Sequence, residues 1–373
     1  MLELPYELLG SRDPRATNYE HKWRRVFKLQ DLPWLGDHHI QNEPVIPAAI
    51  VCVMALAAAM DISNGRQADI IELSSVTIGR PVVLKAPSVE LETSLSITSL
   101  IDSGNARIDC IQAEFSLNEV AAHDHKMVTS AEGTLRVTFA DHESTGPSIL
   151  SSTRQPKPCG LIPVNVNQFY DSLSEVGLSY RGAFRAFTSA ERRLDYACAV
   201  TNTTDEAGGV SGLLHPTRLE GCFQTLLLAF AAPRDGSLWT SFTPTNIGRL
   251  TLFPHSFVGL DKHASVTVEA HLQEFEPGYE AVFSMIKGNI DVRSSETGEL
   301  QIRLESLTMG PTISSAEKQD KLMYLKMAWQ QNILSGVLLE KNNNSSCHQR
   351  LGLSDGHRYI LAATRQISHR HRK

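Results

Sequence analysis

The stretch "WLGDHHIQNEPVIPAAIVCVMALAAAM", residues 34–60, places two adjacent histidines directly before the longest apolar run of the chain. This run, from about Val45 to Met60, is too short to span a bilayer comfortably and lies well inside the chain. It therefore predicts a buried helix from Pro47 to about Ala59. Two titratable imidazoles thus lie just before the N-terminus of the most hydrophobic element. This placement indicates a chemical role for them.

A second long apolar helix is predicted after His215-Pro216, where Leu219, Phe223, Leu226, Leu227 and Phe230 recur at helical spacing. Around the two helices, several segments alternate apolar and polar residues with period two, which is typical of half-buried antiparallel strands. These segments are "VELETSLSI" (89–97), "TLRVTF" (134–139), "ASVTVEAHL" (264–272) and "ELQIRLE" (299–305).

The pattern predicts an α+β fold with internal duplication, in which a curved antiparallel sheet wraps one central helix and the unit is made twice. The expected parts are an N-terminal unit over 1–140, a Ser-, Pro- and Gly-rich linker over 141–163, a C-terminal unit over 164–315, and a final segment over 316–373. In this last segment we expect a helix within 316–341 and then a poorly ordered, basic tail.

Composition narrows the classes of function. The 373 residues are 42% hydrophobic and 20% charged, and the net charge of -6 lacks the basic footprint of a nucleic-acid binder. No secretory signal is found in "MLELPYELLG", so we expect a cytoplasmic protein without membrane contact. The six cysteines show neither a CxxC pair nor metal-ligand spacing, so neither a metal site nor a disulfide framework is predicted.

His38 is the candidate base, because it precedes a helix N-terminus. The free N–H groups of that terminus suit a polarised thioester carbonyl, and a base beside them can take a proton from the carbon next to the carbonyl. The alternative is that His38 only caps or packs. Glu220 is the candidate acid, since a carboxyl group beside apolar surface has a raised pKa. Gln224, four residues later, shares its helical face and is expected to orient it; the alternative is an exposed pair at a helix edge.

Together these groups suffice to eliminate water from a 3-hydroxyacyl thioester: a base at C2, an acid for the C3 hydroxyl and an electrophilic contact for the carbonyl oxygen. Such a reaction needs no metal or organic cofactor.

The chain also resembles the dehydratase domain of fungal highly reducing polyketide synthases, from Tyr6 to about Trp329. The resemblance is carried by several stretches together: "LLG" (8–10), "KWRRVFKL" (22–29), the histidine motif with Trp34, Leu35, Asp37, His38 and Pro47, "GLSYRGAF" (177–184), and the second motif with His215, Pro216, Leu219, Glu220, Phe223 and Gln224.

This resemblance implies a double hotdog fold and an acyl chain tethered by phosphopantetheine to an acyl carrier protein. It assigns the base role to His38 and places Glu220 at the acid position. The substrate-binding set it suggests is Gln224, Tyr180, Pro47, Asn42, Phe223 and His215, although His215 equally suits a helix cap. Expected partners are an acyl carrier protein or polyketide synthase, and a homodimer is possible.

The chain departs from the family pattern at functional positions. The acid is Glu220 instead of aspartate, which extends the carboxyl group by about 1.5 Å, and a misplacement of that size can cost about a hundredfold in rate. Asn42 replaces a glycine, Ile46 replaces a phenylalanine, and Arg181-Gly182 replaces Gly-Pro. Two alternatives therefore stay open: an isomerase or cyclase on the same fold, and a non-catalytic module that binds a carrier or synthase.

Overall fold

The computed structural model describes residues 7–84, 88–102, 108–120, 127–139, 157–202, 214–257, 264–276, 284–312, 325–330 and 360–365. Residues 1–315 form one compact unit, and residues 316–373 form a second unit. Each unit is described by itself.

The N-terminal half of the first unit contains one long helix among strands. Its elements are β1 (Ser11–Arg12), β2 (Glu20–Phe27), the 3₁₀ helix η1 (Pro33–Asp37), β3 (His38–Ile40), β4 (Glu43–Ile46), α1 (Ala48–Ile62), β5 (Ala68–Ile78), β6 (Val82–Val83), β7 (Val89–Asp102), β8 (Ile108–Val120) and β9 (Met127–Phe139).

The C-terminal half repeats this plan with one additional helix. Its elements are β10 (Ile162–Pro163), α2 (Val166–Glu175), β11 (Leu178–Tyr180), η2 (Gly182–Phe184), β12 (Phe187–Arg193), β13 (Tyr196–Thr201), α3 (Pro216–Phe230), β14 (Phe242–Leu252), η4 (Pro254–Phe257), β15 (Val266–Glu276), β16 (Met285–Ser294) and β17 (Leu300–Pro311).

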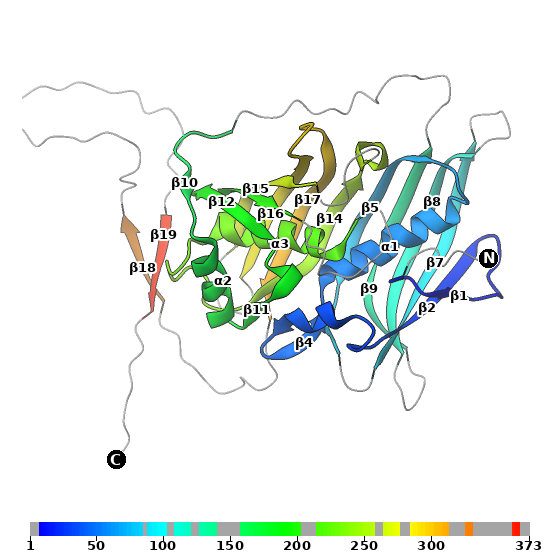
Figure 1. Cartoon of the computed structure of the whole chain (residues 1–373), viewed down its shortest axis with the longest axis horizontal. Helices are drawn as coiled ribbons and strands as arrows, with labels where there is room; N and C mark the ends of the chain where they lie inside the picture. The colour runs from blue at the N-terminus through cyan, green and yellow to red at the C-terminus, as the bar shows by residue number, and fades with distance from the viewer. Residues whose placement is uncertain are drawn as a thin grey trace, which may run out of the picture. The chain divides into compact units, whose positions relative to one another are not determined.

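The two halves share one antiparallel sheet of 13 strands, in the order β1-β2-β7-β8-β9-β5-β14-β17-β16-β15-β13-β12-β10. The strands β5 and β14 form the seam, where Leu250 pairs with Leu73 and Ile247 pairs with Val76. Figure 1 shows the first half of the sheet around α1 and the second half around α3. This is the expected double hotdog, and its two sheets are joined edge to edge.

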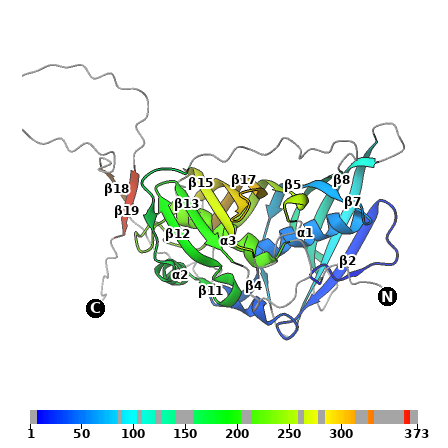
Figure 2. The same ribbon diagram turned by 45° about the horizontal axis from the view of Figure 1, so that its top comes forward.

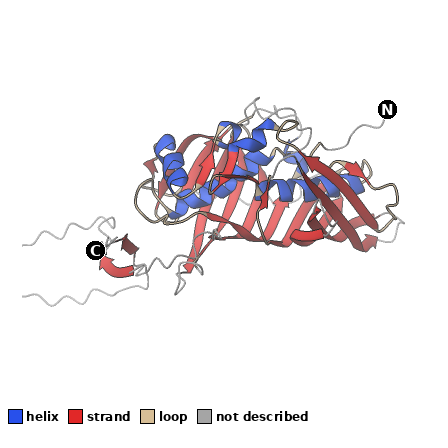
Figure 3. Ribbon diagram, turned by 90° about the horizontal axis from the view of Figure 1, so that it is seen from below, coloured by secondary structure: helices blue, strands red, loops and turns tan. Residues whose placement is uncertain are grey.

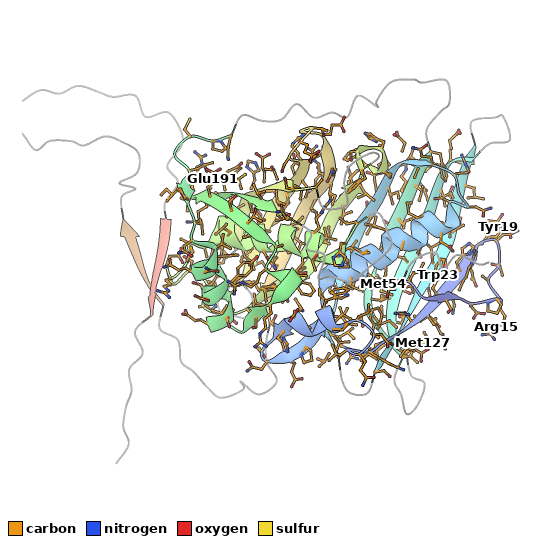
Figure 4. All side chains as sticks on the ribbon, in the orientation of Figure 1. Arg15, Tyr19, Trp23, Met54, Met127 and Glu191 are labelled. Carbon is orange, nitrogen blue, oxygen red and sulfur yellow. The ribbon has the colours of Figure 1, made fainter. Side chains whose placement is uncertain are left out.

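Both central helices lie on the same face of the long sheet (Figure 3). The sequence of α1 is rich in alanine, which favours helix and allows the sheet to approach closely. Its residues from Ala49 to Ala59 are all buried, so α1 is enclosed on every side. Met54 of α1 and Trp23 of β2, both labelled in Figure 4, are fully buried in this core.

The strand patterns also hold. Along β7 the predicted inward residues Val89, Leu91 and Leu95 are buried and Ile97 is half-buried. The inward sets of β9, β15 and β17 are buried as well, except for the half-buried Leu272: they are Leu135, Val137, Phe139, Val266, Val268, Ala270, Leu300, Ile302 and Leu304.

The helix α2 was not predicted, because its apolar residues are interrupted by polar ones. It begins after Asn165, whose side-chain oxygen accepts a hydrogen bond from the Gln168 N–H. Phe169, Tyr170 and Leu173 form its buried face. A 10-residue helix with a narrow apolar stripe gives a weaker pattern than α1 or α3.

In the second unit, β18 (Leu325–Gln330) pairs with β19 (Ile360–Arg365) in an antiparallel ribbon. The helix expected within 316–341 is therefore wrong at 325–330, and the rest of that segment lies outside the described residues. Leu325, Met327 and Trp329 alternate with other residues at period two, which favours a strand when a partner strand is present. The boundaries proposed for the domains stay predictions, and most of the linker also lies outside the described residues.

Candidate active site

A small second sheet, in the order β11-β3-β4-β6, brings the predicted base to the junction between the two halves. His38 on β3 comes from the N-terminal half, and its cross-strand partner is Tyr180 on β11 of the C-terminal half. Figure 2 shows β11 and β4 close together below α3 in this view, and β3 lies between them in the sheet order. The site is thus made by pairing strands that are distant in the sequence.

Asn42 lies at the turn of the hairpin between β3 and β4. Gln41 and Asn42 have φ angles of 51° and 68°, as in a two-residue turn of type I′. Asparagine is, after glycine, the residue that tolerates this conformation best. Because Asn42 is exposed at the turn, the structure explains its presence by turn geometry, and its contact with a substrate stays a prediction.

The imidazole of His38 is buried and held in one tautomer. Its Nδ1 lies 2.8 Å from the carbonyl oxygen of Val45, so Nδ1–H donates and Nε2 keeps a free lone pair. The rings of Tyr180 and Phe184 lie 5.4 and 5.3 Å from it. Burial lowers the pKa of His38 to about 4, against the opposing effect of the Val45 carbonyl. His38 is therefore a neutral base near pH 7.

Glu220 lies on α3 with 3% of its surface exposed. Burial raises the pKa of its carboxyl group to about 7, although the Tyr180 hydroxyl and the Ala49 backbone N–H lower that pKa by smaller amounts. Tyr180 donates a hydrogen bond to Oε1 at 3.2 Å. The other oxygen, Oε2, is buried with no hydrogen-bond partner in the structure. A protonated carboxyl group with one uncommitted oxygen is what a general acid requires.

The base and the acid face each other. The Nε2 atom of His38 lies 3.8 Å from Oε1 of Glu220. Because burial disfavours the charged form of both groups, below pH 7 this contact joins a neutral imidazole to a largely protonated acid and is not an ion pair. The two predicted catalytic side chains therefore share one water-poor site.

Gln224 does not orient Glu220, contrary to the expectation from their spacing. Its Oε1 accepts a hydrogen bond from the Tyr170 hydroxyl at 2.9 Å, and its Nε2 donates to the carbonyl oxygen of Phe184 at 3.0 Å. Spacing of four residues places both side chains on one side of α3, but both ends of the Gln224 amide are already bonded to Tyr170 and Phe184. Tyr180 is the residue that holds Glu220.

The remaining predicted residues, Pro47, Phe223 and His215, cap a helix or pack in the core. Pro47 is the N-cap of α1, and Phe223 is buried in the core. His215 is the N-cap of α3, where its side chain accepts a hydrogen bond from the Thr217 backbone N–H. The capping alternative for His215 is thus confirmed. Contacts of these residues with a substrate stay predictions.

Three aromatic residues of this region were not predicted as site residues. Phe184 contacts His38, and Trp34 lies 5.8 Å from Phe184 and 5.2 Å from the ring of His215. Tyr170 bonds to Gln224. Trp34 was visible as part of the histidine motif and Phe184 as part of "GLSYRGAF" (177–184), whereas Tyr170 lies on the unpredicted helix α2.

Within the described ranges, no group of three or more histidine, cysteine, aspartate or glutamate side chains is placed to hold a metal ion. The helices of the described part of the chain are all too short or too polar to cross a membrane.

Two protein-family models match this chain. Residues 7–113 match the model described as "Polyketide synthase dehydratase domain". Residues 150–319 match the model described as "Polyketide synthase dehydratase N-terminal domain". Together the two models cover well over half of the sequence. The chain belongs to the family of polyketide synthase dehydratase domains.

Two fungal relatives are much longer proteins. The stereoselective keto-reductase af490 of Aspergillus fumigatus is 59% identical over all of this chain, which spans 36% of that protein. The PKS-NRPS hybrid synthetase psoA of the same species is 44% identical over 90% of this chain, which spans 8% of that protein. The chain therefore corresponds to roughly a third or less of either relative.

Among solved structures, an inactive mutant of the CurK dehydratase, in which asparagine replaces an aspartate, superposes with a TM-score of 0.62. The match has 18% sequence identity and covers 84% of this chain and 100% of the other. This likeness confirms the double hotdog fold.

Proposed function

We propose that this chain removes water from a 3-hydroxyacyl thioester that is carried on the phosphopantetheine of an acyl carrier protein. The observation that carries the proposal is the buried contact between His38 and Glu220, at 3.8 Å. A neutral imidazole and a protonated carboxyl group at this separation can reach the substituents of two adjacent carbons, which are about 1.5 Å apart.

In the proposed reaction, Nε2 of His38 takes the proton from C2, and the electron pair of that bond forms the C2–C3 double bond. The C3–O bond breaks, and Glu220 gives its proton to the departing oxygen, so that water leaves. The tautomer needed for the first step is the one that the Val45 carbonyl imposes. A contact between the α1 N-terminus and the thioester carbonyl stays part of the proposal.

Glu220 fills the acid position with a longer side chain than aspartate, and its surroundings suit that length. The Tyr180 hydroxyl holds Oε1, which leaves Oε2 for the substrate hydroxyl. The longer carboxyl group is thus anchored and not simply displaced. This anchoring supports catalysis by Glu220 instead of a site that has lost its acid.

The carrier protein belongs to the proposal because the relative psoA is named as a PKS-NRPS hybrid synthetase. No organic cofactor takes part in the proposed reaction, and the phosphopantetheine arm belongs to the carrier. A cytoplasmic location stays part of the proposal.

The test is direct conversion of 3-hydroxybutyryl-pantetheine to the 2-enoyl thioester, followed by mass spectrometry. We expect His38→Ala and Glu220→Gln to abolish the loss of water. His39→Ala is the matched control, since this neighbouring imidazole lies on the other face of β3, and it should retain activity. Unchanged turnover in His38→Ala would refute the proposal.

Further substrates separate the alternatives. An enoyl thioester that is isomerised or cyclised without prior dehydration would indicate the isomerase or cyclase. Binding of carrier protein without any conversion would indicate the non-catalytic module. A 3-ketoacyl thioester with NADPH tests for the keto-reduction that the name of af490 describes, and we expect none from this segment.

A further inference from the structure

The hydroxyl of Tyr170 is the centre of a buried hydrogen-bond network that the proposed reaction does not itself use. It donates to Gln224 Oε1 at 2.9 Å and accepts from the Phe187 backbone N–H at 3.2 Å. Gln224 in turn donates to the carbonyl oxygen of Phe184 at 3.0 Å. Four polar groups from α2, α3 and the segment 184–187 are thereby joined.

This network holds a segment that contacts the candidate catalytic pair. The rings of Tyr180 and Phe184 lie 5.4 and 5.3 Å from His38. Tyr180 also donates the hydrogen bond to Glu220. Phe184 is thus fixed on one side by its contact with His38 and on the other by its carbonyl bond to Gln224. Displacement of residues 184–187 would open the wall around the base.

We infer that Tyr170 is a positioning residue, which fixes the Phe184 side of the wall around His38 by holding Gln224 and the backbone of residues 184–187. The inference rests on the proposed function, since it names a residue that serves the same reaction. Tyr170 does not touch the reacting atoms and acts through Gln224 and Phe184.

The variant Tyr170→Phe isolates the contribution of the hydroxyl. The ring itself is held by other contacts: Phe169 at 5.5 Å, Phe187 at 5.8 Å, and the guanidinium of Arg185 at 4.7 Å from the ring centroid. These contacts persist without the hydroxyl. The matched control is Tyr196→Phe, because the Tyr196 hydroxyl is also buried and donates to a side chain, Glu269, at 3.2 Å.

We expect Tyr170→Phe to lower kcat about tenfold or more with a smaller change in KM, because a small misplacement at the reacting centre has a large effect on rate. Tyr196→Phe should change kcat less than about twofold, since its hydroxyl donates to Glu269 on β15 and not to Gln224. Equal kinetic effects of the two variants would overturn the inference.

A second measurement does not depend on activity. The pKa of His38, followed by NMR titration, is expected to rise toward its ordinary value in Tyr170→Phe, because a loosened wall admits water. It should not move in Tyr196→Phe. If the wild-type chain dehydrates no substrate but this selective shift occurs, the proposed function fails and the positioning role stands. If the wild-type chain dehydrates its substrate but the selective shift does not occur, the proposed function stands and the positioning role fails.

Gln224→Met provides an independent route if Tyr170→Phe fails to fold. It removes the same hydrogen bonds from the other partner, so it should reproduce the fall in kcat and the shift in the His38 pKa. When both variants fold, their combination should be no worse than the stronger single variant. Additive losses, or a Gln224→Met variant with unchanged kcat and His38 pKa, would contradict action through Gln224.

Discussion

His38 and Glu220 show how burial alone prepares two titratable residues for opposite roles. Each is 3% exposed, and burial penalises the charged form of each. For an imidazole this lowers the pKa, and for a carboxyl group it raises the pKa. The same dry surroundings therefore leave one side chain ready to accept a proton and the other ready to donate one.

The rate of dehydration should consequently be bell-shaped in pH. His38 must be neutral, which requires a pH above about 4, and Glu220 must be protonated, which requires a pH below about 7. We expect kcat/KM to be highest between these values and to fall as pH rises above 7. Measured initial rates from pH 4 to 9 test this; a rate that increases through pH 8 would mean that ionised Glu220 is the active form.

Stability should respond to the same two residues with opposite signs. The raised pKa of Glu220 makes folding less favourable as pH rises from 4.5 to about 7, because the unfolded carboxyl group loses its proton first. The lowered pKa of His38 makes folding less favourable as pH falls from 6.5 to about 4. The two effects largely cancel between pH 5 and 6.5.

The variant Glu220→Gln should separate the contribution of Glu220 to stability from that of His38. Relative to wild type, we expect the free energy of unfolding of this variant to increase between pH 4.5 and 7, by an amount of order 2 to 3 kcal/mol. Urea unfolding at pH 5, 6 and 7 measures the difference. A difference that is constant over this range would show that Glu220 titrates normally in the folded chain.

At the scale of elements, the connection between β11 and η2 positions the site. The Arg181 backbone N–H donates to the Asp37 carbonyl oxygen at 2.9 Å, next to His38. Gly182 has a φ of 44°, and a Cβ at this position would run into Oδ2 of Asp37. Where the family pattern has proline, this chain therefore needs a residue without a side chain.

Gly182→Pro, which restores the family residue, should destabilise the chain. Proline fixes φ near −65°, so the connection must shift, and we expect a loss of at least about 1 kcal/mol in the free energy of unfolding. Gly65→Ala is the control for strain alone, because Gly65 has a φ of 78° with no atoms near its Cβ position. Denaturant titrations compare the variants; a gain in stability on Gly182→Pro would show that the connection tolerates the family geometry.

The helices and strands were largely predictable because their patterns are local. The regions of α1 and α3 have long apolar sequences, and the strands β7, β9, β15 and β17 alternate at period two. The sequence did not indicate the helix α2, and it predicted a helix where β18 lies. In α2 the apolar stripe is short, and at β18 the apolar residues fit either period until a partner strand is known.

At the scale of the whole first unit, the seam between β5 and β14 should make the two halves unfold together. The buried pairs Leu250–Leu73 and Ile247–Val76 cross this seam, and β3 pairs with β11 between the halves. Unfolding one half would therefore expose the core of the other.

Fluorescence tests this cooperativity, because Trp23 lies in the N-terminal half and Trp239 lies in the C-terminal half. In variants that keep one or the other tryptophan, we expect both probes to report the same denaturant midpoint. Two separated midpoints would mean that each hotdog folds independently and that the seam contributes little.

The sequence by itself determined the central helices, the alternating strands and the residue types of the candidate pair, because each depends on neighbours within a few positions. Only the tertiary structure decided that Nε2 of His38 lies 3.8 Å from Glu220, that Tyr180 holds the acid, and that Gln224 serves Phe184 and Tyr170. These contacts join residues from opposite halves or from separate elements of one half, and the pKa values follow from burial that the whole fold creates. Local periodicity contains no information about such distances, since strand pairing and helix packing set them.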